Sequence, residues 1–140
     1  MAEPRARVFE YQVDVDGDGD AHSDRGGAPI PADAAWTPEH LVLAGLARCT
    51  LTSLAYHAKR SGLTVTGTAR AHGTVTRRER DGRFAFVAVE VAFDVALDPR
   101  PAPDALRELL AKAERDCFVG ASLTAAPTYT WRVEGEEIRP

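Results

Sequence analysis

The sequence has little of what several large classes of protein require. Its 140 residues contain no block of lysine and arginine, and the formal net charge is −4, so nothing favours binding to nucleic acid. A membrane-spanning helix needs about 20 consecutive apolar residues, and no segment of the chain approaches that length. We therefore expect neither a nucleic-acid partner nor a membrane partner.

Secretion signals and disulfide frameworks are missing as well. The N-terminal segment MAEPRARVFE lacks the apolar core of a signal peptide, which predicts a cytoplasmic protein. The chain has only two cysteines, Cys49 and Cys117, and lasting structural disulfides are uncommon in the cytoplasm. We interpret the two residues as free thiols or as a redox couple.

Patterns that bind metals are also absent. The four histidines lack a ligand spacing such as H-x-x-x-H, and the cysteines are 68 positions apart, so we expect no metal site. Residues 14–19 imitate the start of a calcium loop, D-x-D-x-D-G. Position twelve of such a loop must supply a bidentate carboxylate, but Arg25 stands there. We interpret this segment as an acidic turn.

What is present predicts one domain, residues 1–140, of the α+β class. A chain of this length with 44% hydrophobic residues can bury a core of its own. Stretches rich in Val, Thr and Phe flank Asp81 and Gly82, a pattern typical of a long antiparallel hairpin. In chain order, the expected elements are a strand over 5–16, a helix over 38–61, strands over 63–79 and 83–97, a helix over 104–117 and a strand over 127–134.

The helix expected over 38–61 is apolar on nearly all sides. Thr37 is a good N-cap, Pro38 suits the first helical position, and Gly62 favours termination. A helix with few polar faces is buried on most sides. One domain of 140 residues rarely encloses so long a helix, so we expect part of it to face a second subunit.

Cys49 lies within this helix, and the residues around it leave two interpretations open. Free cysteine is among the most buried residue types, so packing alone explains its position. Alternatively it is a nucleophile, because Gly45, one turn earlier, leaves open space beside the thiol. His57 is about 12 Å further along the helix axis, too far to act as its base. Cys117, at the expected end of the second helix, then suits a resolving thiol, because the negative helix terminus disfavours its thiolate.

Two segments together resemble the OsmC/Ohr family of thiol-dependent peroxidases. One is TPEHLVLAGLARCTLTSLA, residues 37–55, and the other is AERDCFVGASL, which contains Cys117 followed by small residues. The resemblance covers roughly residues 8–134. The residues that carry the first motif are Pro38, Glu39, Leu41, Ala44, Ala47 and Cys49.

This resemblance implies antiparallel sheets around a long, central, buried helix in an intertwined homodimer, with active sites at the interface. It also implies that Cys49 attacks an organic hydroperoxide and that Cys117 resolves the product as a disulfide. An external dithiol or lipoyl-type reductant then reduces the disulfide, and no bound cofactor is expected.

Family members stabilise the thiolate with an arginine that the motif glutamate holds. Glu39 matches that glutamate, but it is about 15 Å from Cys49 along the helix axis. An arginine must therefore lie between them, and Arg25 is the candidate.

One departure from the family concerns the residue after the second cysteine. Many active members have proline there, whereas this chain has Phe118. We expect a cytoplasmic peroxidase that acts in oxidative or osmotic stress defence. The alternative is a non-enzymatic protein of the same fold that binds an apolar ligand at the dimer interface.

Overall fold

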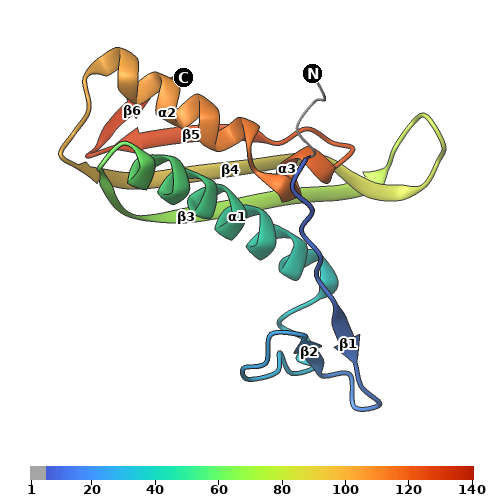
Figure 1. Cartoon of the computed structure of the whole chain (residues 1–140). Helices are drawn as coiled ribbons and strands as arrows, with labels where there is room; N and C mark the ends of the chain where they lie inside the picture. The colour runs from blue at the N-terminus through green and yellow to red at the C-terminus, as the bar shows by residue number, and fades with distance from the viewer. Residues whose placement is uncertain (1–5) are drawn as a thin grey trace, which may run out of the picture. The chain divides into compact units, whose positions relative to one another are not determined.

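The computed structural model describes residues 6–140, in which the elements follow the order β1-β2-α1-β3-β4-α2-α3-β5-β6 (Figure 1). Contacts along the chain divide it into two units, one ending at Pro38 and the other beginning at Glu39. The N-terminal unit contains β1 (Val13–Val15) and β2 (Ala21–Ser23). The longer elements, and the two cysteines, belong to the C-terminal unit.

The N-terminal unit is built on a short antiparallel hairpin with an acidic turn. The Asp16 carboxylate accepts hydrogen bonds from the backbone amides of Asp18 and Asp20, each at 3.0 Å. The other carboxylate oxygen lies 2.8 Å from Nε2 of His22. These bonds close the turn within the hairpin, so the interpretation of this segment as an acidic turn is confirmed.

The strand expected over 5–16 is much shorter than predicted. Residue 5 lies outside the described residues, residues 6–12 form no strand, and only Val13–Val15 pairs with β2. The apolar side chains that suggested a buried face are exposed, for example Val8 at 81% and Tyr11 at 64%. A strand needs a hydrogen-bonded partner along its length, and β2 supplies only three residues.

Helix α1 (Pro38–Arg60) ends within one residue of its predicted boundary. Gly62 adopts φ +75° just after it. Its amide donates to the Lys59 carbonyl at 3.1 Å, and the Leu63 amide donates to the Ala58 carbonyl at 2.8 Å. This pair of bonds is a Schellman closure, which satisfies the last carbonyls of the helix and requires the left-handed conformation that glycine adopts easily.

The C-terminal unit contains one four-stranded sheet in the order β3-β4-β5-β6. Strands β3 (Thr64–Arg77) and β4 (Phe84–Asp98) are the predicted hairpin, and β5 (Thr128–Val133) is the predicted last strand. Strands β4 and β5 are parallel, which corrects the expectation of antiparallel sheets. The reason is the intervening helical segment, which returns the chain to the same end of the sheet.

Three short elements escaped prediction. Helix α2 (Pro103–Arg115) was expected, but α3 (Phe118–Ser122), β6 (Glu136–Ile138) and β2 were not. Elements of three to five residues are too short to display a period in the sequence. Helix α3 matters most, because it begins directly after Cys117.

The core lies between one face of the sheet and both long helices. Trp131 of β5 stacks on Phe93 of β4 with ring centroids 4.1 Å apart. Helices α1 and α2 contribute leucines to the same cluster, so both cover this face (Figure 1). The alternate residues of β4 that point into the core are Val89, Val91, Phe93, Val95 and Leu97.

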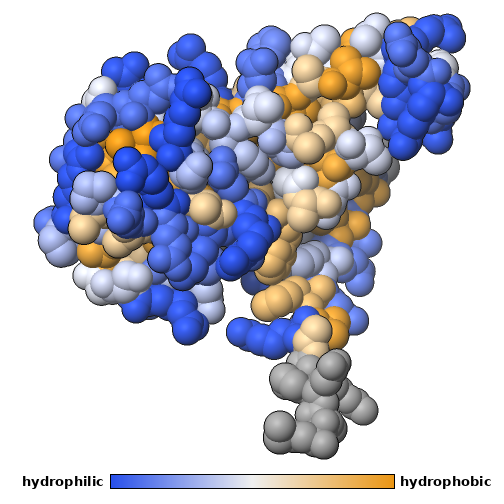
Figure 2. Space-filling model, turned by 90° about the horizontal axis from the view of Figure 1, so that it is seen from above, coloured by the Kyte–Doolittle hydropathy of each residue, from blue (hydrophilic) through white to orange (hydrophobic). Residues whose placement is uncertain are grey.

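The other side of α1 is not covered within the single chain. Leu41 is 37% exposed, Val42 36% and Tyr56 54%. Figure 2 shows that mainly polar residues lie over α2, on another face of the C-terminal unit. No helix of the described residues is long and apolar enough to cross a membrane.

Candidate active site

The side chains of Cys49 and Cys117 are in contact. Cys49 lies in the middle of α1 and Cys117 lies between α2 and α3, and the two thiols are within hydrogen-bonding reach of each other. Both are free thiols. Cys49 is half-buried, whereas Cys117 is 0% exposed. The fold therefore joins one accessible thiol to one enclosed thiol.

The junction between α2 and α3 fixes the position of Cys117. This residue is the N-cap of α3, and its Sγ accepts a hydrogen bond from the Gly120 amide at 3.4 Å. The sequence placed Cys117 only at the negative end of the preceding helix. That prediction was incomplete, because a second helix begins at the same residue and directs its free amides toward the thiols.

Two backbone amides reach the Cys49 sulfur. Burial raises the pKa of the Cys49 thiol, and the neighbouring Cys117 raises it further, while hydrogen bonds from the amides of Val119 and Phe118 lower it. The net effect is a raised pKa, and none of these influences is a cation. Within the described chain Cys49 is therefore a protonated thiol at neutral pH.

Two hydroxyl groups surround the Cys117 sulfur. Oγ1 of Thr50 lies 3.2 Å from it and 3.1 Å from the Leu46 carbonyl oxygen. The Tyr129 hydroxyl lies beside this pair and interacts with both Thr50 and Cys117. Burial, followed by the charge on Cys117, raises the pKa of Tyr129 to about 12. Tyr129 thus keeps its proton, and remains a hydrogen-bond donor, at neutral pH.

Gly120 makes room for this arrangement. A Cβ at position 120 would overlap the Tyr129 hydroxyl and would lie 3.4 Å from the Cys117 sulfur. Only a residue without a side chain lets α3 approach the tyrosine so closely. The glycine in this small-residue segment therefore has a direct role in the geometry of the site.

The other side of the thiol pair is open. Apart from its chain neighbours and the backbone of α1 itself, no atom lies within 4 Å of the position that a Gly45 Cβ would occupy, as its spacing from Cys49 on the helix predicted. Leu41 and Val42 lie further toward the start of α1 and are partly exposed. A molecule with apolar groups can approach Cys49 along this side.

Glu39 and Arg25 belong to different units of the chain. Glu39 is exposed in the first turn of α1, ten positions before Cys49. Arg25 is part of the N-terminal unit, where its guanidinium carbon lies 5.3 Å from the centre of the Tyr11 ring. Their proposed cooperation at the thiolate stays a prediction.

His57 has a partner other than Cys49. Its Nε2 lies 2.8 Å from Oδ2 of Asp116, and Asp116 is also paired with Arg115 at 2.9 Å. These contacts, with Arg115 first, lower the pKa of Asp116 to about 2. His57 therefore links α1 to the residue that precedes Cys117.

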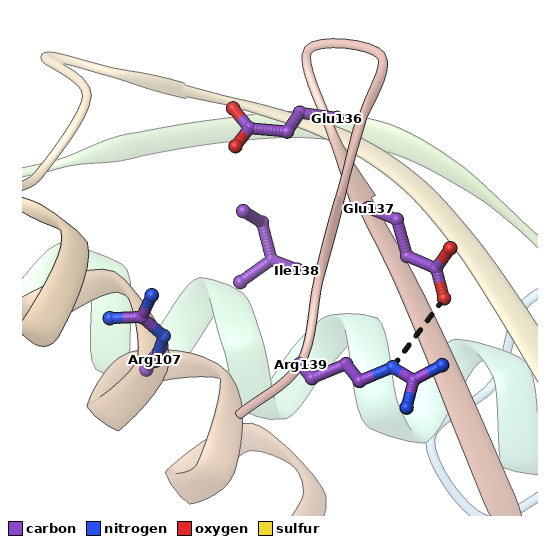
Figure 3. Close-up of a pocket in the computed structure, with 5 residues that line it drawn as sticks. All are labelled: Arg107, Glu136, Glu137, Ile138 and Arg139. Carbon is purple, nitrogen blue, oxygen red and sulfur yellow. Dashed lines mark ion pairs between the residues drawn. The ribbon is translucent and has the colours of Figure 1, made fainter.

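Two surface pockets are lined by residues other than the cysteines. A shallow pocket of about 360 Å³ is bounded by Arg107 of α2 and by residues of the C-terminal segment, with Arg139 paired to Glu137 at 3.9 Å (Figure 3). A second pocket, of about 370 Å³, reaches the side chain of Tyr129. Among residues 6–140, no group of three or more His, Cys, Asp or Glu side chains is arranged to hold a metal ion.

The model of the OsmC-like protein family matches residues 31–132. This range is most of the chain and includes Glu39 and both cysteines. The chain belongs to the OsmC-like family. Arg25 lies before the matched range. No curated protein matches the sequence.

Solved structures share the fold of this OsmC-like protein. An OsmC-like protein of unknown function from Vibrio cholerae has a TM-score of 0.72 at 15% identity, covering 89% of this chain and 100% of that one. The organic hydroperoxide resistance protein OhrB of Bacillus subtilis has a TM-score of 0.58 at 22% identity, covering 89% and 98%. An organic hydroperoxide resistance protein OsmC from Legionella pneumophila has a TM-score of 0.58 at 16% identity, covering 91% and 98%.

Sequence reasoning missed Thr50 and Tyr129, although each had left a signal. Alternation along the last strand places Tyr129 on the same face as Trp131 and Val133, and a phenol on an inward face needs a hydrogen-bond partner. Thr50 is a polar residue on the core side of an apolar helix, which also requires a partner. The position of the α3 amides could not be predicted from the sequence in this way.

Proposed function

We propose that this OsmC-like protein is a thiol-dependent peroxidase that reduces organic hydroperoxides in the cytoplasm, in oxidative or osmotic stress defence. The observation that supports this function best is the contact between the half-buried Cys49 and the fully enclosed Cys117. An accessible thiol can meet the peroxide, and an enclosed neighbour can intercept the oxidised product before other thiols do.

The reaction has two steps on the enzyme. The Cys49 thiolate attacks the distal peroxide oxygen, so that an S–O bond forms, the O–O bond breaks, and the alkoxide takes up a proton and leaves as an alcohol. The Cys117 sulfur then attacks the sulfenic sulfur of Cys49. An S–S bond forms, the S–O bond breaks, and water leaves. A dithiol or lipoyl-type reductant returns both thiols, and the reaction needs no bound cofactor.

Cys49 must first be ionised. Because burial raises the pKa of its thiol, the two α3 amides need help from a positive charge. We propose Arg25, oriented by Glu39, for this role. Glu39 in the first turn of α1 is exposed, so its carboxylate is accessible to a guanidinium.

We also propose that the working unit is a homodimer. Support comes from the uncovered apolar side of α1, where Leu41, Val42 and Tyr56 are exposed. A second copy would cover these side chains and complete the burial that the apolar sequence of α1 predicts.

A non-enzymatic, ligand-binding role is the second candidate. The open space at Gly45, next to partly exposed apolar residues, is compatible with an apolar ligand that does not react. Phe118, which stands where many active relatives have proline, is 54% exposed and adds apolar surface near the thiols.

Peroxide treatment separates the two functions. The reduced protein is treated with one equivalent of cumene hydroperoxide, alkylated, and analysed by intact mass and peptide mapping. The peroxidase should yield a stoichiometric Cys49–Cys117 disulfide. Cys49→Ser should consume peroxide only at the uncatalysed rate, whereas Cys117→Ser should consume one equivalent and stop at the sulfenic acid. Two unreacted thiols in the wild-type protein would contradict the peroxidase and favour the binding protein.

A further inference from the structure

Cys117 has to act as a nucleophile where water does not reach. Its side chain is 0% exposed, so no solvent stabilises a negative charge on the sulfur. The thiolate is nevertheless the form that attacks a sulfenic sulfur efficiently. A charge in such a place is tolerated only when protein donors replace the lost hydration. The donors around Cys117 therefore decide how readily it reacts.

Donors reach the sulfur from three elements. Thr50 of α1 lies 3.2 Å from it, and the Gly120 amide of α3 lies 3.4 Å from it. The Tyr129 hydroxyl belongs to β5, lies against Gly120 as the sulfur does, and interacts with both Thr50 and the sulfur. Thr50 is itself 0% exposed, so its hydroxyl has no water as an alternative partner.

We infer that the hydroxyls of Thr50 and Tyr129, here called the hydroxyl pair, stabilise the Cys117 thiolate and thereby set the rate of the disulfide-forming step. The inference rests on the proposed peroxidase function. It assigns a role to two residues that are not required for the attack on the peroxide.

The Thr50 hydroxyl can serve two states of the sulfur because it has one proton and two acceptors. The Leu46 carbonyl oxygen lies at 3.1 Å and the Cys117 sulfur at 3.2 Å. Next to a neutral thiol, the proton is directed to the carbonyl, a common arrangement for threonine in helices. Next to a thiolate, a rotation about one bond directs it to the sulfur, where a charge-assisted bond is stronger.

The Tyr129 hydroxyl can donate a hydrogen bond to the sulfur without transferring its proton. When Cys117 attacks the oxidised Cys49, its thiol proton ends in the water that forms from the sulfenic hydroxyl, so atoms and charges balance without a further base. Tyr129 keeps its own proton throughout. Gly120 lets this hydroxyl approach, because any side chain at that position would overlap it.

Several titratable groups surround the hydroxyl pair. Cys49 faces Cys117 from α1, and Glu114 of α2 acts on Tyr129 and accepts a hydrogen bond from Trp131 at 3.4 Å. Asp116 precedes Cys117, but its charge is balanced by Arg115, and its carboxylate also contacts His57. The negative charge of Glu114 opposes a second negative charge nearby, which increases the need for donors at the sulfur.

Tyr129→Phe and Thr50→Val test the inference, with Thr66→Val, exposed on β3, as the control. After one equivalent of cumene hydroperoxide, rapid quenching with a dimedone-type reagent measures Cys49 sulfenic acid, and alkylation followed by mass spectrometry measures the disulfide. We expect sulfenic acid to form at the wild-type rate in all three variants. The disulfide should form about 10- to 100-fold more slowly in the two test variants, the range for a lost hydrogen bond to a charged group.

A second measurement does not depend on peroxide. In the Cys49→Ser background, ¹³C-labelled cysteine gives a single Cβ signal, from Cys117, whose chemical shift distinguishes thiol from thiolate. Adding Tyr129→Phe should move this signal toward the thiol position at the same pH, while Thr66→Val should leave it in place. A thermal unfolding measurement on each variant checks that it is folded.

The outcomes separate the inference from the proposed function. A folded Tyr129→Phe variant with an unchanged disulfide rate and an unchanged Cys117 signal would overturn the role of the hydroxyl pair and leave the peroxidase intact. A wild-type protein that forms neither sulfenic acid nor disulfide would overturn the peroxidase. The Cys117 signal would still decide whether the hydroxyls stabilise the thiolate.

Discussion

The two cysteines differ in what their surroundings supply. Cys117 is enclosed by hydroxyl and amide donors, whereas Cys49 receives two amides and is open on the Gly45 side. Burial raises the pKa of Cys49, and the two amides do not compensate for it. At the residue scale, the proposed activity therefore depends on a positive charge near Cys49.

Arg25→Gln tests that charge through the pH dependence of Cys49 alkylation. A thiol whose pKa is raised reacts through its thiolate only at alkaline pH. If Arg25 approaches Cys49, the wild-type protein should react with iodoacetamide at lower pH than the variant. We expect the variant to react at least tenfold more slowly at pH 7, with its rate still rising above pH 9. Arg83→Gln, at the tip of the hairpin, is the control, and identical profiles for all three proteins would exclude Arg25.

At the scale of elements, length decided what the sequence could predict. Helices α1 and α2 and the β3–β4 hairpin each span at least 13 residues, enough to display a period and its end signals. The short α3 and β6 display neither. The pairing of Cys49 with Cys117 was predicted from the family resemblance. The residues around Cys49 alone were explained equally well by packing in the core. Thr50 and Tyr129 become neighbours only when α1 packs against β5. Local sequence patterns do not predict that packing.

The contact between α1 and the α2–α3 junction makes an acid-dependent contribution to stability. The pKa of Asp116 is lowered from 3.8 to about 2, mainly by Arg115 and then by His57. A lowered pKa in the folded state means that the contribution is fully present above pH 3.8 and is lost as the pH falls through 2. Because the Asp116 side chain is 38% exposed, solvent screening limits its value to about 1 kcal/mol.

Asp116→Asn should therefore lower the thermal midpoint by a few degrees at pH 7, and the difference from the wild-type protein should shrink toward zero at pH 2. Scanning calorimetry at both pH values measures it. Asp104→Asn is the control, since Asp104 is fully exposed on α2 and should change little at either pH. A difference that persists undiminished at pH 2 would show that the asparagine acts through packing and not through charge.

At the scale of the whole molecule, the apolar side of α1 is the surface that we propose for the dimer interface. One side of the helix is buried in the core of its own chain. On the other side Leu41, Val42 and Tyr56 are partly exposed, and Cys49 is half-buried. Helix α1 has so few polar residues on this side that a single chain leaves an apolar surface in water. A homodimer that covers this side would also enclose the approach to Cys49, so that assembly and reactivity become linked.

Sedimentation velocity on Val42→Glu tests this link. A glutamate buried without a partner costs several kcal/mol, enough to dissociate a dimer at micromolar concentration. We expect the wild-type protein to sediment as a dimer and Val42→Glu as a folded monomer. The monomer should also react with cumene hydroperoxide more slowly, because Cys49 becomes solvated on its open side. Lys59→Glu, exposed near the end of α1, should remain dimeric. A monomeric wild-type protein would contradict the dimer, and a dimeric Val42→Glu variant would place its interface on another surface.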